Sequence, residues 1–163
     1  MDIGEFFGSL YTGFGLEDLY GSGEGELAEY LWGNASSVVA TNQFVGIGLI
    51  TIGIALAVVA IYYYVLGQLL QKPSWGNRFT WLMALVANSL IAFLAAWQWT
   101  LSDLYSGDMV TIDAKTGQQT DLPISALNCL QFGLANAIVT VLLFIVFSLI
   151  LKWKSRDFSH IPF

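Results

Sequence analysis

The feature that most constrains this chain is residues 44–66, an unbroken run without a charged side chain. A helix rises about 1.5 Å per residue, so this run is long enough to cross a hydrocarbon core of roughly 30 Å. Two later runs, residues 79–101 and 126–151, also lack Asp, Glu, Lys, Arg and His. The pattern predicts an all-α integral membrane protein with three transmembrane helices over these ranges.

The composition agrees with a membrane protein and narrows its chemistry. Hydrophobic residues make up 56% of the 163 residues and charged residues 11%, against about 25% charged residues in soluble domains. The net charge of −6 speaks against nucleic acid as a partner, because phosphate binding relies on clustered bases. One cysteine, Cys129, and one histidine, His160, are too few for an internal disulfide, a cysteine metal site or a histidine-bound intramembrane haem. We expect no cofactor and no metal.

The six basic residues predict how the chain is oriented in the membrane. Five of them flank the spans on one side, which the positive-inside rule places in the cytoplasm: Lys72, Arg78, Lys152, Lys154 and Arg156. The N-terminus is then outside and the C-terminus cytoplasmic. Three parts follow: an acidic amphipathic segment outside (1–43), a membrane domain (44–151) with an outer loop (102–125), and a basic cytoplasmic tail (152–163). The expected location is the bacterial cytoplasmic (inner) membrane.

The outer segments have local patterns of their own. Apolar residues fall at helical spacing from Ile3 to Phe14 and again from Leu27 to Leu31, which predicts two short amphipathic helices around a Gly-rich turn at 21–25. All charges there are acidic, which favours packing against protein over attraction to anionic lipid. In the outer loop, residues 109–112 and 118–120 predict a small β-hairpin, with Gly117 supplying a positive φ.

Small residues recur along the first two spans. Gly46, Gly53, Ala60 and Gly67, the last just beyond the first span, recur every seven residues, and Ala57 lies one turn after Gly53. Ala84 and Ala87 share one face of the second span. Small residues on one face allow another helix to approach closely. The alternative is that this spacing is an accident of a Gly-rich helix.

Four uncharged polar residues of the spans are expected to be buried: Asn88, Gln131, Asn136 and Thr140. The simpler expectation is that they form hydrogen bonds between helices and fix their register. The alternative is that Asn136 and Thr140, four residues apart on one helical face, line a narrow polar path when several copies assemble. Asp157, Ser159 and His160 occur together only in the tail, which lacks the rigid frame of a catalytic triad. We expect no enzyme.

These features predict a non-enzymatic membrane subunit that anchors or organises a larger multiprotein complex, such as a secretion, injection or energy-transducing assembly. Its partners would be the lipid bilayer and other membrane-protein subunits or copies of itself. The alternative function is a homo-oligomeric pore or ion channel, including a membrane-disrupting effector.

Overall fold

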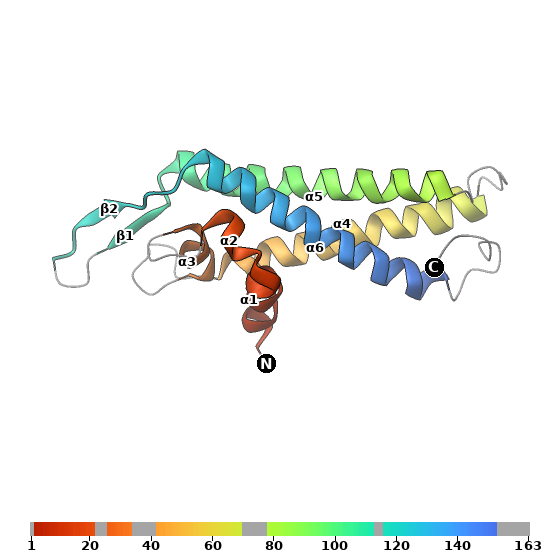
Figure 1. The fold of residues 1–163 in the computed structure, drawn as a ribbon, viewed down its shortest axis with the longest axis horizontal. Helices are drawn as coiled ribbons and strands as arrows, with labels where there is room; N and C mark the ends of the chain where they lie inside the picture. The colour runs from red at the N-terminus through yellow and green to blue at the C-terminus, as the bar shows by residue number, and fades with distance from the viewer. Residues whose placement is uncertain (1, 22–25, 34–41, 70–77, 113–115, 153–163) are drawn as a thin grey trace. The chain divides into compact units, whose positions relative to one another are not determined.

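A computed structural model describes residues 2–21, 26–33, 42–69, 78–112 and 116–152, and most of them are helical (Figure 1). The chain divides into two compact units. The first unit comprises Met1–Leu49 and Phe93–Asn136, and the second comprises Ile50–Ala92 and Ala137–Phe163. Each long helix contributes one part to each unit, so the packing is described below for each unit by itself.

Three helices are long and apolar enough to cross a membrane, which confirms the three predicted spans. They are α4 (Gln43–Ala60), which continues as the π-helix η2 (Ile61–Leu69), α5 (Arg78–Ser106) and α6 (Ala126–Lys152). Helices satisfy their backbone hydrogen bonds internally, as a segment in hydrocarbon must. Helix α5 runs five residues beyond the predicted end at 101 and stops before Gly107, whose φ of 79° breaks the helix. The side chain of Ser125 and that of Asn128 cap the start of α6.

The N-terminal segment is helical, as predicted. Helix α1 (Ile3–Thr12) begins at a capping box. The Asp2 side chain accepts a hydrogen bond from the backbone N–H of Glu5, and the Glu5 side chain accepts one from the backbone N–H of Asp2. The short helices η1 (Gly13–Gly15), α2 (Glu17–Tyr20) and α3 (Leu27–Trp32) follow, and α3 ends at Gly33 in the left-handed conformation. Residues 22–25 of the predicted Gly-rich turn lie outside the described residues.

The predicted hairpin is present. Strands β1 (Val110–Ile112) and β2 (Gln119–Asp121) pair antiparallel, with Thr111 opposite Thr120. Gly117 has a φ of 68°, which confirms the expected need for glycine in this connection.

Candidate functional site

In the first unit, a buried hydrogen bond joins α1 to the spans. The Tyr11 hydroxyl donates to Oδ1 of Asn136 over 2.6 Å, and both side chains are buried. The Tyr11 ring stacks on Phe44 of α4 at 5.3 Å between centroids, and it also meets Phe132 of α6 at 5.6 Å. The Tyr11 ring thus packs against aromatic rings of α4 and α6. Its hydroxyl gives the buried Asn136 amide a hydrogen-bond partner, without which burying that amide would be costly.

Two glycines allow this close packing. A Cβ atom on Gly8 would overlap the indole ring of Trp32, and one on Gly48 of α4 would overlap the ring of Phe7. Bulkier residues at either glycine would therefore push an aromatic ring out of its place. The face of α1 formed by Phe7, Gly8 and Tyr11 is the one that docks on the rest of the first unit.

Further polar contacts hold the N-terminal helices together. Tyr20 donates from its hydroxyl to the Tyr11 carbonyl over 3.2 Å, and the Asn128 amide donates to the Tyr20 carbonyl over 3.1 Å. The Tyr30 hydroxyl of α3 donates to Oδ2 of Asp103 over 3.2 Å. Burial, followed by the negative charge of Asp103, raises the pKa of Tyr30 well above its usual range. Burial, followed by the charge of Glu17, does the same for the pKa of Tyr20, so both hydroxyls remain protonated donors at neutral pH.

In the second unit, one amide lies between α5 and α6. Nδ2 of Asn88 donates to the Thr140 carbonyl over 3.4 Å, and both residues are fully buried. Oδ1 of Asn88 and Oγ1 of Thr140 make no hydrogen bond within the described part of the chain. This hydrogen bond and the packing around it contribute to the register between these two helix segments.

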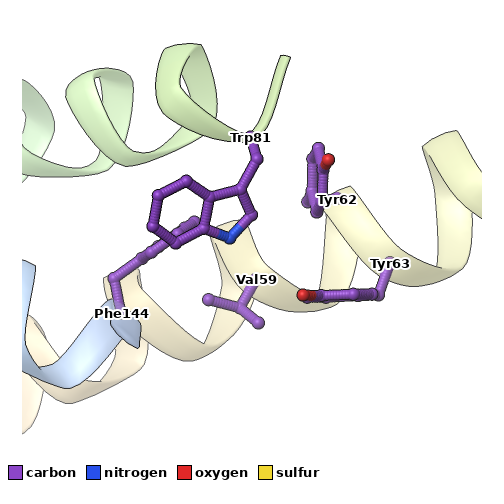
Figure 2. Close-up of a cluster of buried hydrophobic side chains, with 5 residues drawn as sticks. All are labelled: Val59, Tyr62, Tyr63, Trp81 and Phe144. Carbon is purple, nitrogen blue, oxygen red and sulfur yellow. The ribbon is translucent and has the colours of Figure 1, made fainter. Parts of the chain in front are cut away.

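Figure 2 shows an apolar cluster of the second unit, in which Trp81 of α5 lies between Phe144 of α6 and two tyrosines of η2. Its members are Val59, Tyr62, Tyr63, Trp81 and Phe144. Ser148 provides the polar partner: its Oγ accepts from Nε1 of Trp81 over 2.9 Å and bonds the Tyr63 hydroxyl over 2.8 Å. Trp81, in the first turn of α5, therefore faces the protein interior, where its side-chain N–H has a hydrogen-bond partner.

The predicted helix-packing residues occupy different environments. A Cβ atom built on Gly46 would lie 3.7 Å from the ring of Trp99. One built on Gly53 would meet no other side chain, and no backbone outside its own helical turn, within 4 Å among the described residues. Ala57 and Ala87 are exposed, and Ala60 and Ala84 are half-buried. Gly67 lies in η2. Ala84 packs against the cluster of Figure 2.

The predicted polar and basic residues are also distributed unevenly. Asn88, Asn136 and Thr140 are buried and Gln131 is half-buried. Arg78 begins α5 and Lys152 ends α6. Lys72, Lys154 and Arg156 lie outside the described residues, as do Asp157, Ser159 and His160.

Within the described ranges, no group of three or more His, Cys, Asp or Glu side chains is placed to hold a metal ion. Sequence reasoning did not pair Tyr11 with Asn136, 125 residues away, or place Ser148 between Tyr63 and Trp81. For Ser148 a signal existed, since it is the last polar residue of an otherwise apolar run.

Comparison of the chain with protein-family models, with curated proteins and with solved structures gives no match.

Proposed function

We propose that this chain is a non-enzymatic, three-span membrane subunit that anchors or organises a larger membrane complex. The observation that carries the proposal is a division of roles along the spans. Three of the four polar residues, Asn88, Asn136 and Thr140, are buried within the chain, while the small residues Gly53 and Ala57 are left uncovered on α4.

Gly53 and Ala57 lie four residues apart and therefore share one face of α4. Lipid tails are as apolar as leucine, so helices in a bilayer associate through close packing and polar contacts rather than through hydrophobic burial. Two small residues one turn apart let a second backbone approach closely. The partner on this face is another subunit or a second copy of the chain.

The burial of Asn136 and Thr140 gives less support to a pore lined by that face. The exposed fraction of these side chains is 1% and 0%, and the Asn136 amide oxygen already accepts the Tyr11 hydroxyl. A pore lined by these two side chains would require Tyr11 to move away from Asn136 and from the aromatic rings around it. The proposal retains the predicted orientation, with the N-terminal segment outside, and a bacterial inner membrane as the location.

The test is the size and composition of the particle extracted from native membranes in mild detergent. We expect the chain to co-purify with a stoichiometric partner or as a defined oligomer. Gly53→Leu should lose that association while still inserting, because the larger side chain separates the two helices. Val86→Leu, at an exposed position of α5, is the matched control and should behave as the wild type.

Two results would contradict the proposal. One is a monodisperse monomer without a stoichiometric partner. The other is steady ion conductance from the reconstituted protein that Asn136→Leu alters, which would favour the pore.

A further inference from the structure

Helix α1 leaves a large apolar surface uncovered. The exposed fraction is 63% for Ile3 and 48% for Phe6, and Leu10, one turn after Phe6, is half-buried. These three side chains fall on one stripe of the helix, separate from the face of Phe7 and Tyr11 that packs on the first unit. An exposed apolar stripe of this kind needs an apolar neighbour.

The contacts of α1 place it below the ends of the spans. Phe7 packs on Gly48, the sixth residue of α4, and Tyr11 bonds Asn136, the eleventh residue of α6. At about 1.5 Å per residue, these contacts lie about 7 Å and about 15 Å along the spans from their first residues. Helices that rest in a membrane surface lie about 5–10 Å into the boundary between headgroups and acyl chains.

The rotation of α1 about its axis is fixed by its neighbours. Its Gly8 side meets Trp32 of α3, and its Phe7 side meets Gly48 of α4. Helix α3 lies near the ends of the spans, because its Tyr30 bonds Asp103 in the last turn of α5. The direction from Gly8 towards Phe7 around α1 therefore leads from the end of the spans towards the middle of the membrane.

Successive residues turn by about 100° around a helix. Continuing past Phe7 in the same direction leads to the apolar stripe of Ile3, Leu10 and Phe6. Continuing past Gly8 in the opposite direction leads to a polar stripe of Thr12, Glu5 and Ser9. The helix thus has three faces: one packed on the protein, one apolar and one polar.

We propose that α1 is a membrane-surface helix whose Ile3, Phe6 and Leu10 side chains are immersed in the acyl chains of the leaflet where α4 begins. The spans of the same unit also expose apolar side chains, since Leu49 of α4 and Leu134 of α6 are 57% and 49% exposed. This inference stands apart from the proposed complex, since it concerns lipid contact on a different helix.

The charges of α1 identify the lipid feature it recognises. The helix has no Lys or Arg, and its carboxylates, Asp2 and Glu5, are engaged in its capping box. Anionic headgroups therefore provide no attraction, and the acyl chains provide the contact. Binding of α1 to the leaflet is accordingly insensitive to the fraction of anionic lipid.

The test is a measurement of depth with nitroxide spin labels in phosphatidylcholine nanodiscs. In a Cys129→Ala background, Phe6→Cys samples the apolar stripe and Ser9→Cys samples the polar stripe of the same helix. Leu49→Cys on α4 and Thr120→Cys on β2 give the lipid and water references. Collision rates with oxygen, which partitions into lipid, are compared with those of a water-soluble nickel chelate.

We expect the oxygen-to-nickel ratio to be several-fold higher at position 6 than at position 9, with position 6 resembling 49 and position 9 resembling 120. Ile3→Cys should repeat the result for Phe6→Cys, which guards against a local disturbance. Equal nickel access at positions 6 and 9 would overturn the proposal, because α1 would then lie in water. A label at position 6 that is immobile and inaccessible to both reagents would also overturn it, because protein would then cover the stripe.

Discussion

At the scale of single residues, the buried Tyr11 hydroxyl and Asn136 amide oxygen are hydrogen-bond partners. Both side chains are buried among apolar residues and are shielded from water. Removing one partner leaves the other buried with a hydrogen bond unmade, which costs about 1–3 kcal/mol.

Tyr11→Phe should therefore lower the stability of the protein by about 1–2 kcal/mol while keeping its fold, since the ring still packs against the aromatic rings of α4 and α6. The midpoint of thermal unfolding in mild detergent, followed by circular dichroism, measures this loss. Tyr105→Phe, at a position 78% exposed, is the control and should leave the midpoint unchanged. An equal effect of the two changes would show that the Tyr11 hydroxyl contributes nothing.

The raised pKa of Tyr30 predicts that the protein loses stability in alkaline solution. Burial and the charge of Asp103 raise its pKa in the folded state above the value of about 10 of an unfolded chain. The folded state then prefers the protonated phenol, so the contribution is complete below about pH 10 and falls as the pH rises towards the folded-state pKa. Unfolding midpoints between about pH 9 and 12 should decline less steeply in Tyr30→Phe than in the wild type. Parallel declines would contradict this.

At the scale of helices and strands, local chemistry was enough to predict most elements. The uncharged runs predicted all three long helices, because hydrocarbon leaves an isolated segment few alternatives. The hairpin followed from its Gly117 turn, and each strand begins one residue later than predicted. The pairings were not predictable in the same way, since Tyr11 and Asn136 are joined by tertiary packing that no local pattern encodes.

Trp81 shows the limit of a residue-type rule. Tryptophan near a helix end is typical of a membrane interface, yet here Ser148, 67 residues away, draws the indole inward. A rule based on position along one helix cannot contain that contact.

The docking of α1 gives a prediction at this scale. Alanine is favoured over glycine inside a helix by about 1 kcal/mol, so Gly8→Ala should stabilise an isolated α1. In the protein we expect a net loss of about 1–3 kcal/mol, because the added Cβ meets the Trp32 ring. Gly13→Ala is the control: no atom lies within 4 Å of its Cβ position and its φ of −62° suits alanine. Hydrogen exchange of the α1 amides should quicken in Gly8→Ala only.

At the scale of the whole molecule, the orientation of the chain remains a prediction from its basic residues. It places the hairpin outside and the connection at residues 70–77 in the cytoplasm. In intact cells with Cys129→Ala, a membrane-impermeant maleimide should label Thr120→Cys, and it should label Gly76→Cys only after permeabilisation. The reverse pattern would invert the topology.

The contact between Tyr11 and Asn136 also has a consequence for synthesis. The two residues are 125 apart in sequence, so α1 leaves the ribosome well before its partner in the last span exists. At about 5–20 residues per second, that interval is roughly 6–25 s. During that interval, α1 can contact Phe44 and Gly48 of α4 but not yet its partners on α6. Completion of the last span is thus the step that locks the N-terminus, and a chain truncated before Asn136 should carry an α1 that proteases can reach.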